Sequence, residues 1–251
     1  MTRTALITGG SSGIGKACAE ALAKDGINVA IADISEEKGQ EVAGELDGLF
    51  ISSDLTSREG CKEAVDKTVQ HYDGLDILVN NAGFQNIDPI PEFPEDTWDD
   101  MLSLLLTAPF LLTKYAWEHL IKSGHGRVVN IGSAHSLAAS PYKVAYVTAK
   151  HGLMGFTKVT ALEGGEHGLT CNTVCPAYVR TPLVEKQIED QARTRGIRPE
   201  EVEEKVLLEH TAIKKLLEPE DVGGYVSYLC SEGAWGITGT AQTMDLGWTA
   251  S

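Results

Sequence analysis

The stretch Thr8-Gly9-Gly10-Ser11-Ser12-Gly13-Ile14-Gly15 decides the fold of this chain. It follows the apolar run Ala5-Leu6-Ile7 and opens an amphipathic stretch over residues 16–24. A strand that leads through a glycine turn into a helix forms an anion site. Glycine lets the backbone approach a phosphate, and the helix N-terminus offers free N–H groups and a partial positive charge. A flexible glycine loop is the alternative, but the order strand, turn, helix favours nucleotide binding.

Further strand-like runs recur along the chain, separated by helical patterns. They are short, continuously apolar or β-branched and lack polar alternation, which is typical of a parallel sheet covered on both faces. They occupy residues 29–32, 48–51, 77–80, 127–131, 169–174 and 239–244. This alternation predicts an α/β fold with a doubly wound parallel sheet of the Rossmann type, in a single domain over residues 1–251.

One segment breaks the alternation. Residues from about 183 to 215 are polar and charged, with two helical patterns around Arg195-Gly196-Ile197-Arg198-Pro199. A segment this long inside a compact domain is typical of a lid or a binding element. We predict a small helical lid here, with a solvated helical hairpin of no consequence as the alternative.

Composition and charge argue against several classes of partner. The chain has 251 residues, 42% of them hydrophobic, and a formal net charge of −15, which argues against nucleic acid or an anionic membrane surface. No apolar run approaches the ~20 residues that a membrane span requires. Met1-Thr2-Arg3-Thr4 leads directly into the first strand, so we expect no signal peptide and a cytoplasmic protein.

The cysteines are odd in number, scattered and without a C-x-x-C pair. They are Cys18, Cys61, Cys171, Cys175 and Cys230. This spacing predicts reduced core thiols in a cytosolic protein. Cys171 and Cys175 are too few for a zinc site and have no histidine near them at ligand spacing, so we expect no metal.

Asp33 ends the second strand, where a dinucleotide fold places the acid that binds the adenosine ribose. In NADP a 2′-phosphate would face this carboxylate, and two like charges ~4 Å apart cost about 1–4 kcal/mol. No Arg or Lys lies in the glycine turn or directly after Asp33, so we predict NAD. The alternative role for Asp33 is a helix N-cap ahead of Glu36-Glu37.

Two other strand ends carry candidate cofactor contacts. Asp54-Leu55 follows the third strand and is expected near the adenine. Asn80-Asn81-Ala82-Gly83 follows the fourth strand and is expected along the nicotinamide half. Open α/β sheets bind ligands at the carboxyl ends of their strands.

Ser133, Tyr146 and Lys150 are the candidate catalytic residues. Ser133 follows the fifth strand, and the i, i+4 spacing puts Tyr146 and Lys150 on one helix face. A phenol that titrates near pH ~10 is a poor base at neutral pH. One ammonium ~4 Å away supplies about 4 kcal/mol at an effective dielectric of 20, enough to lower the pKa by about three units. We therefore expect Lys150 to lower the pKa of Tyr146.

With these motifs, the chain resembles the short-chain dehydrogenase/reductase family almost from end to end. The resemblance implies an NAD(P)-dependent conversion between an alcohol and a ketone. Tyr146 would be the general acid/base, Ser133 would hydrogen-bond the reacting oxygen, and Lys150 would hold the nicotinamide ribose. The implied cofactor contacts are Gly9, Ser12, Gly13, Ile14, Gly15, Asp33, Asp54, Leu55, Asn81, Ala82, Gly83, Tyr146, Lys150, Pro176, Val179 and Thr181.

Two positions depart from the family pattern. Ala177, in Cys175-Pro176-Ala177, stands where a glycine is usual, and Leu105 stands where the family has an asparagine. That asparagine helps to organise a water in the proton relay to the lysine, although a backbone carbonyl can hold the same water. Leu105 therefore keeps open a slower relay, or a homologue that binds NAD without turnover.

Within the family, the chain is similar to the bacterial D-3-hydroxybutyrate dehydrogenases, through Phe84-Gln85, Ser133-Ala134-His135, Lys143, residues 183–187 and Gly247-Trp248. This similarity implies that (R)-3-hydroxybutyrate is oxidised reversibly to acetoacetate. The implied substrate contacts are Gln85, Ser133, His135, Lys143, Tyr146, Tyr178, Gln187 and Trp248.

Four of these residues would bind the carboxylate of the substrate: Gln85, His135, Lys143 and Gln187. A short acid needs a cation and several neutral donors, which this set offers. Tyr178 and Trp248 would wall the methyl group. Taken singly, Gln85 and Lys143 fit solvated loop residues, and His135 fits a structural hydrogen-bonder. Another small hydroxy acid, a polyol or an acyl thioester is the alternative substrate.

Assembly is expected to be oligomeric. The apolar region over residues 101–106 and the C-terminal strand and tail resemble family surfaces that are used in a homotetramer.

Overall fold

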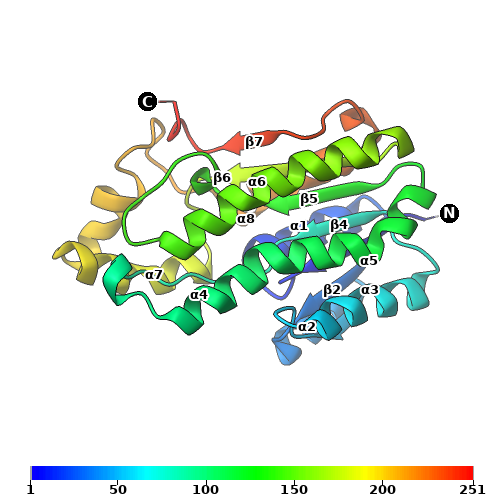
Figure 1. The fold of residues 1–251 in the computed structure, drawn as a ribbon, viewed down its shortest axis with the longest axis horizontal. Coiled ribbons are helices and arrows are strands. Elements are labelled where there is room, and N and C mark those ends of the chain that lie inside the picture. Colours follow the sequence, from blue (N-terminus) through cyan, green and yellow to red (C-terminus); the bar gives the residue numbers. More distant parts are fainter. Residues whose placement is uncertain (1, 251) are drawn as a thin grey trace.

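Seven strands pair in one parallel sheet in the computed structural model, which describes residues 2–250 (Figure 1). The strand order is β3-β2-β1-β4-β5-β6-β7, so the doubly wound fold is confirmed. The chain reverses direction across the sheet between β1 and β4, where open α/β sheets form a ligand crevice. The strands are β1 (Thr4–Thr8), β2 (Asn28–Asp33), β3 (Leu49–Ser52), β4 (Ile77–Asn80), β5 (Arg127–Ile131), β6 (Thr170–Pro176) and β7 (Ala241–Met244).

Helices cover both faces of this sheet, which explains why the strands are continuously apolar. Side chains alternate along β1, so that Ala5 and Ile7 join one buried cluster and Leu6 joins the other. The first cluster packs under α1 (Gly13–Lys24), α2 (Glu36–Glu45) and α8 (Pro219–Cys230). The second lies mainly under α3 (Arg58–Tyr72) and α5 (Ala108–Lys122), and one residue of α6 (Val144–Gly164) joins it. All five cysteines are buried and unpaired, as expected of core thiols.

The glycine turn lies tightly against the end of β4. Gly9 has a φ of +63°, and a Cβ on Gly15 would lie 2.2 Å from the carbonyl oxygen of Gly9. The Thr8 hydroxyl accepts hydrogen bonds from the backbone N–H groups of Asn81 and Ala82 at 2.9 and 3.0 Å. The turn is therefore held where the ends of β1 and β4 meet.

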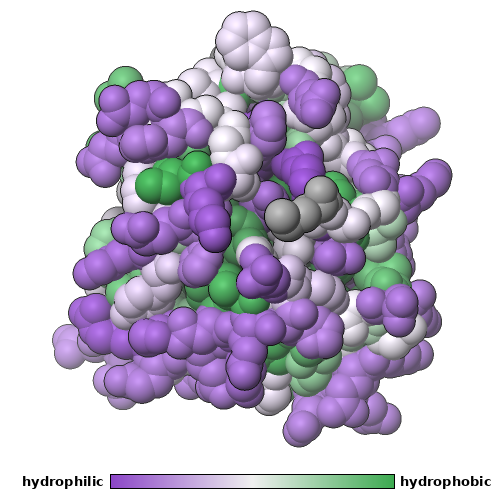
Figure 2. Space-filling model, turned by 90° about the vertical axis from the view of Figure 1, so that its right-hand side faces the viewer, coloured by the Kyte–Doolittle hydropathy of each residue, from purple (hydrophilic) through white to green (hydrophobic). Residues whose placement is uncertain are grey.

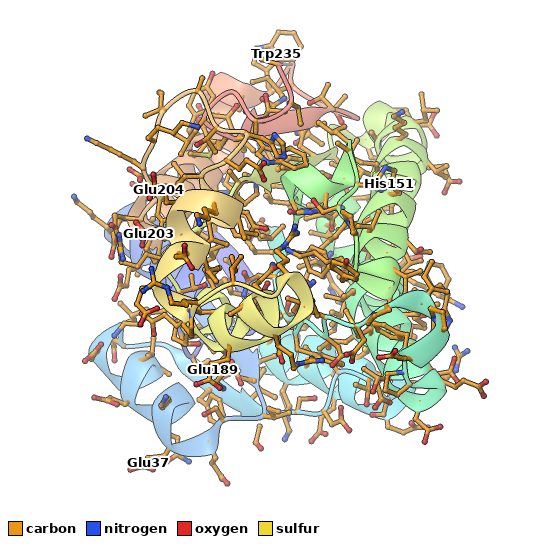
Figure 3. The ribbon with its side chains drawn as sticks, turned by 90° about the vertical axis from the view of Figure 1, so that its left-hand side faces the viewer. Glu37, His151, Glu189, Glu203, Glu204 and Trp235 are labelled. Carbon is orange, nitrogen blue, oxygen red and sulfur yellow. The ribbon has the colours of Figure 1, made fainter. Side chains whose placement is uncertain are left out.

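A helical segment crosses the carboxyl ends of the strands after β6. It comprises α7 (Pro182–Arg195), the 3₁₀ turn η5 (Pro199–Glu201) and the π turn η6 (Glu203–Leu207) (Figure 1). The first predicted helix is confirmed, but the second is only these two short turns. Gly196, with a φ of +65°, ends α7, and few apolar side chains in the second part are buried to support a longer helix: Val202, Val206 and Leu207. The acidic Glu189, Glu203 and Glu204 lie on its outer surface (Figure 3).

Part of the expected oligomer surface over residues 101–106 is buried within this chain, and the rest is half-buried. The helix α4 (Glu95–Leu102) continues through the π turn η2 (Ser103–Thr107) into α5, and Met101 and Leu105 are buried against α6. Their apolar character serves the core of this chain. The exposed apolar side chains nearby are Phe110 on α5 and Leu162 on α6 instead.

The face at the amino ends of the strands is covered mainly by hydrophilic side chains, with small separate apolar areas (Figure 2). Over residues 2–250, no helix combines the length and the hydropathy needed to cross a membrane.

Candidate active site

Two adjoining cavities open at the carboxyl ends of the strands. The glycine-turn cavity, of about 1510 Å³, lies between the turn and the ends of β2, β3 and β4. The Tyr146 cavity, of about 810 Å³, lies between α6, the end of β6 and α7. Both cavities are lined by Ile14, Asn81, Gly83, Thr181 and Leu183. A ligand that spans both would therefore pass between the turn and the start of α7.

Most of the predicted cofactor residues line the glycine-turn cavity. They are Gly9, Ser12, Gly13, Ile14, Asp33, Asp54, Leu55, Asn81, Ala82, Gly83 and Thr181. Gly15 does not line either cavity, because it lies beneath the turn against the Gly9 carbonyl. In this position Gly15 lets α1 close against the turn, and its contact with the cofactor remains a prediction. Thr181 is the N-cap of α7 and accepts a hydrogen bond from the Val184 N–H at 3.4 Å.

Asp33 holds the turn as well as facing the cavity. Its Oδ2 accepts from the N–H and hydroxyl of Ser11 at 3.1 and 2.6 Å, and its Oδ1 accepts from the N–H of Ser35 at 2.9 Å. The N-cap of α2 is Ser35, so the N-cap alternative for Asp33 is wrong. Ser11 and Ser35 were not singled out in the sequence, because their role depends on the ends of β1 and β2 lying side by side.

Two lysines that the sequence did not suggest also line the glycine-turn cavity, Lys38 on α2 and Lys186 on α7. The residues that directly follow Asp33 include no Lys or Arg. Helix α2 brings Lys38, five positions later, to the same cavity. Lys38 and Lys186 are both exposed, so solvent screens their charges.

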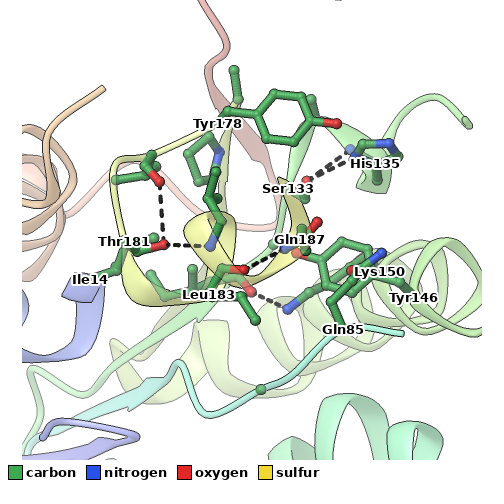
Figure 4. Close-up of a pocket in the computed structure, with 18 of the residues that line it drawn as sticks. Ile14, Gln85, Ser133, His135, Tyr146, Lys150, Tyr178, Thr181, Leu183 and Gln187 are labelled. Carbon is green, nitrogen blue, oxygen red and sulfur yellow. Dashed lines mark hydrogen bonds between the residues drawn. The ribbon is translucent and has the colours of Figure 1, made fainter. Parts of the chain in front are cut away.

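The Tyr146 cavity collects all the predicted catalytic and substrate residues (Figure 4). They come from the loop after β4, from the turn after β5 with η3 (Ala134–Ser136), from α6 and its N-cap, from the loop after β6, from α7 and from the C-terminal tail. The set comprises Gln85, Ser133, His135, Lys143, Tyr146, Lys150, Tyr178, Gln187 and Trp248, together with the cofactor candidates Pro176 and Val179.

Burial dominates the electrostatics of Tyr146 and Lys150. Burial raises the pKa of Tyr146 to about 12, against a lowering contribution from the Ser133 hydroxyl, and it lowers the pKa of Lys150 to about 8. Lys150 Nζ lies 5.5 Å from the centre of the Tyr146 ring and donates to the Ile131 carbonyl at 2.6 Å. The expected lowering of the phenol pKa by Lys150 is therefore wrong for the chain alone, because desolvation outweighs the ammonium at this separation.

His135 lines the cavity as predicted and also makes hydrogen bonds within the chain, so its role as a carboxylate donor remains a prediction. Its Nδ1 lies 3.3 Å from the Ser133 hydroxyl and its Nε2 lies 3.0 Å from the Ser140 hydroxyl. Burial first, and then the charge of Lys143, lowers the His135 pKa to about 3, so the ring is neutral. With both nitrogens engaged, His135 fits the structural alternative and orients Ser133. Ser140 was not predicted, because only folding brings it to the ring.

The remaining polar groups make this cavity a site for an anion. Lys143 is 3% exposed, and the buried Gln85 Nε2 has no hydrogen-bond partner within residues 2–250. Among those residues, no Asp or Glu lines the cavity. Buried N–H donors without partners are costly, so a ligand that accepts hydrogen bonds relieves them.

Gln187 and Trp248 complete the wall. Gln187 lies on α7 and donates to the Leu183 carbonyl at 3.0 Å. Trp248 lies 5.4 Å from the His135 ring, between ring centres. Its tail is held by the carboxylate of Asp245, which accepts from the N–H groups of Gly247 and Thr249 at 3.0 and 2.9 Å. The pattern D-x-G after a strand could have pointed to Asp245.

The two family departures both line the Tyr146 cavity. Leu105 is buried in the π turn η2, and a Cβ on Gly83 would lie 2.6 Å from its Cδ2. Leu105 thus adds an apolar wall beside Gly83 and brings no hydrogen-bonding group. Ala177 follows the end of β6, and its N–H donates to the Met244 carbonyl at 3.1 Å.

A glycine turn at the sheet reversal, next to a cavity that pairs a tyrosine with a lysine, defines a class of enzyme: oxidoreductases that use a nicotinamide cofactor. The chain belongs to the short chain dehydrogenase family, whose pattern matches residues 3–192.

Relatives with names match along the whole chain. The chain is 46% identical to a D-beta-hydroxybutyrate dehydrogenase of Rhizobium meliloti (strain 1021), over 100% of both chains. It is 38% identical to a D-beta-hydroxybutyrate dehydrogenase of Cupriavidus necator, covering 99% of this chain and 98% of the relative. A solved structure of a variant actinorhodin polyketide ketoreductase with NADPH is 30% identical, with a TM-score of 0.95 over 100% of this chain and 98% of that one.

Proposed function

We propose that this protein is an NAD-dependent dehydrogenase that interconverts (R)-3-hydroxybutyrate and acetoacetate. The observation that carries the proposal is the lining of the Tyr146 cavity, where the ammonium of Lys143 and the unpartnered Gln85 Nε2 are buried without an acidic side chain among the described residues. Such a cavity favours a small anion beside the catalytic phenol. The names of two relatives at 46% and 38% identity agree with this substrate.

The glycine-turn cavity fits a dinucleotide. A side chain on Gly9 would strike the backbone of Ala82, with its Cβ 2.8 Å from the Cα, so only glycine leaves this approach open. No side chain of the described residues caps the first turn of α1, and that turn carries no acidic residue, so its N–H groups suit a phosphate. Asp33 would accept from the ribose hydroxyls and repel a 2′-phosphate, which favours NAD. The exposed Lys38 offsets this repulsion only weakly.

When bound, an oxidised nicotinamide accepts hydride and adds a positive charge to the site. The residues of the chain orient the substrate and transfer the proton. Ser133, oriented by His135, donates to the reacting oxygen, and Tyr146 as phenolate takes the hydroxyl proton. Because burial raises the Tyr146 pKa to about 12, oxidation would depend on the positive charge that the oxidised cofactor brings to the site. In the reverse direction the protonated phenol donates to the ketone oxygen.

Lys143, Gln85 and Gln187 would bind the carboxylate, and Tyr178 and Trp248 would enclose the methyl group. Gln187 lies on α7, so substrate binding would draw the predicted lid, residues 183–215, towards the cavity.

The test is an assay of purified protein with NAD or NADP and with (R)-3-hydroxybutyrate, (S)-3-hydroxybutyrate or 2-butanol. We expect the highest kcat/KM for the (R)-acid with NAD. 2-Butanol keeps the secondary alcohol but lacks the carboxylate, so its kcat/KM is expected to be lower by about 100-fold or more, the value of a charge-assisted contact of about 3 kcal/mol. Equal rates for the acid and 2-butanol would overturn the substrate proposal, and preference for NADP would overturn the cofactor proposal.

A longer 3-hydroxy acid is the second candidate. Tyr178 and Trp248 also line a further cavity of about 1280 Å³ that contains Arg195 and His210. Only the side chains of Tyr178 and Trp248 therefore separate the proposed methyl site from this further cavity. A longer acyl chain would extend towards it, so 3-hydroxyhexanoate should be included in the same assay.

We also infer a homotetramer in the cytoplasm. The exposed apolar side chains Phe110, Val159, Leu162 and Trp235 on α5, α6 and the segment before β7 support self-association. Sedimentation that gives a monomer mass would contradict it.

A further inference from the structure

The ammonium of Lys143 has an unusual partner. Lys143 precedes α6 and is 3% exposed. Its Nζ donates to the hydroxyl oxygen of Tyr178 at 3.1 Å and lies 5.0 Å from the centre of that ring. Within residues 2–250, this hydroxyl is the one hydrogen-bond acceptor that the ammonium has. An ammonium carries three donors, so two remain for a ligand.

Tyr178 is itself held by the segment over the site. Its ring packs against the cluster formed by Ala192, Val202, Val206 and Leu207. This packing fixes the position of the Tyr178 ring. Its hydroxyl meets Lys143 at the wall that separates the Tyr146 cavity from the neighbouring cavity with Arg195 and His210.

A hydroxyl at this place does two things that an apolar ring cannot. Its oxygen accepts from the ammonium, and its own hydrogen stays free to donate. Burial raises the Tyr178 pKa to about 12, so the hydroxyl keeps its proton at neutral pH and does not cancel the charge of Lys143.

We propose that Tyr178 is a positioning residue, whose hydroxyl holds the Lys143 ammonium in the Tyr146 cavity. The same hydroxyl donates a hydrogen bond to the carboxylate that the ammonium binds. The proposal deepens the proposed function and rests on it for the identity of the anion. It gives Tyr178 a polar role beyond the apolar wall expected from the sequence.

The decisive variant is Tyr178→Phe, which removes one oxygen and keeps the ring. The matched control is Tyr72→Phe: the Tyr72 hydroxyl also donates a 3.1 Å hydrogen bond, to the Val29 carbonyl, but lies away from both cavities. Butyrate serves as the probe, because it carries the carboxylate and lacks the reacting hydroxyl. Its Ki against the alcohol substrate is measured from pH 6 to 9, with butyramide as the uncharged counterpart.

We expect Tyr178→Phe to raise the Ki of butyrate at least about tenfold at pH 6.5, the effect of one lost hydrogen bond to a charged group. The ammonium loses its acceptor, so the pH at which butyrate binding fails should move lower by about one unit. Butyramide binding should weaken much less than butyrate binding, because a hydrogen bond to a neutral group contributes less than one to a charged group, and Tyr72→Phe should behave as the unmodified protein. A change shared equally by butyrate and butyramide would mean that the ring only shapes the cavity, and would overturn the proposal.

A second measurement separates this inference from the proposed function. The side-chain nitrogen of Lys143 can be titrated by NMR in the cofactor-free protein, identified by its loss in Lys143→Met. Tyr178→Phe should lower the midpoint of that titration even if 3-hydroxybutyrate is not a substrate. An unchanged midpoint together with an unchanged Ki contradicts the role of Tyr178, whereas inactivity of the unmodified protein on the hydroxy acid contradicts the proposed function alone.

Discussion

The two cavities of this protein are built in opposite ways. The glycine-turn cavity is formed largely by backbone at the ends of the strands, with two carboxylates, Asp33 and Asp54, of which the turn itself holds Asp33. The Tyr146 cavity is formed by buried side chains from six separate segments, including two lysines, Lys143 and Lys150. Backbone N–H groups suit the phosphates that all dinucleotides have in common. Buried charged side chains instead select one substrate and take part in the reaction. Changes in the first cavity should therefore affect folding and cofactor affinity, and changes in the second should affect turnover and substrate affinity.

The largest expected effect separates chemistry from cofactor binding. Tyr146→Phe should lower kcat by about 10²- to 10⁴-fold, the range for loss of a general acid/base. NAD affinity, measured by calorimetry, should change little, because the glycine-turn cavity is not touched. A variant that keeps its turnover would contradict the role of Tyr146.

The second prediction concerns pH. Burial, and then the charge of Arg195, lowers the Lys143 pKa to about 7, so in the free enzyme the ammonium is lost as pH rises through 7. A carboxylate binds the charged form, and the Ki of butyrate should rise by about tenfold per unit between pH 7 and 9.

Of the other groups that line the Tyr146 cavity, Lys150 also titrates in that range, because its pKa is about 8. His135, with a pKa of about 3, stays neutral, and Tyr178 and Tyr146, both near 12, keep their protons. Arg195 keeps its charge throughout. The Ki of butyramide, which carries no charge, should change much less with pH than the Ki of butyrate. Lys143→Met should remove the part of the butyrate profile that is due to Lys143, and a profile that this substitution leaves unchanged would mean that Lys143 does not bind the carboxylate.

The third prediction tests the backbone cavity. Gly15→Ala places a Cβ 2.2 Å from the Gly9 carbonyl oxygen, so the free energy of unfolding should fall by about 1–3 kcal/mol and NAD affinity should weaken. Gly44→Ala is the control, because a Cβ there meets nothing within 4 Å and the helix gains up to about 1 kcal/mol. Denaturant unfolding and calorimetry measure both, and a Gly15→Ala protein as stable as the unmodified one would contradict the close approach.

The smallest expected effect concerns the contacts between the segments that line the Tyr146 cavity. Arg193 on α7 contacts Asp88 at 3.3 Å and the Ile87 carbonyl at 3.4 Å, and the Asp88 N–H donates to the Tyr142 carbonyl at 3.1 Å. These contacts join the segments that carry Gln187, Gln85 and Lys143.

Because the Arg193–Asp88 pair is partly exposed, Asp88→Asn should raise KM only a few-fold, with kcat unchanged. Glu63→Gln, which removes an exposed pair with Lys67 on α3, should leave both constants unchanged. Equal effects of the two substitutions on KM would show that the Arg193–Asp88 contact does not help to position the substrate-binding segments.

Much of the site was predictable because local patterns mark it. The i, i+4 pair Tyr146 and Lys150 and the substrate candidates from Gln85 to Trp248 lie in one cavity, although their roles remain predictions. The raised pKa of Tyr146 was not predictable, because it depends on desolvation by side chains from several segments. The hydrogen bonds of His135 with Ser133 and Ser140 are local, but they depend on the conformation of the loop after β5.

The sequence by itself determined the strand–turn–helix unit, the parallel sheet and the membership of the short chain dehydrogenase family. The first two follow from periodicity and glycine spacing, which act over a few residues, and the third follows from the resemblance of the motifs to that family. Only the tertiary structure decided which hydrogen bonds Asp33 and His135 make, that Lys38 and Lys186 face the glycine-turn cavity, and that Lys143 meets the Tyr178 hydroxyl. Burial and charge act through space, so their outcome is set only when the segments pack together.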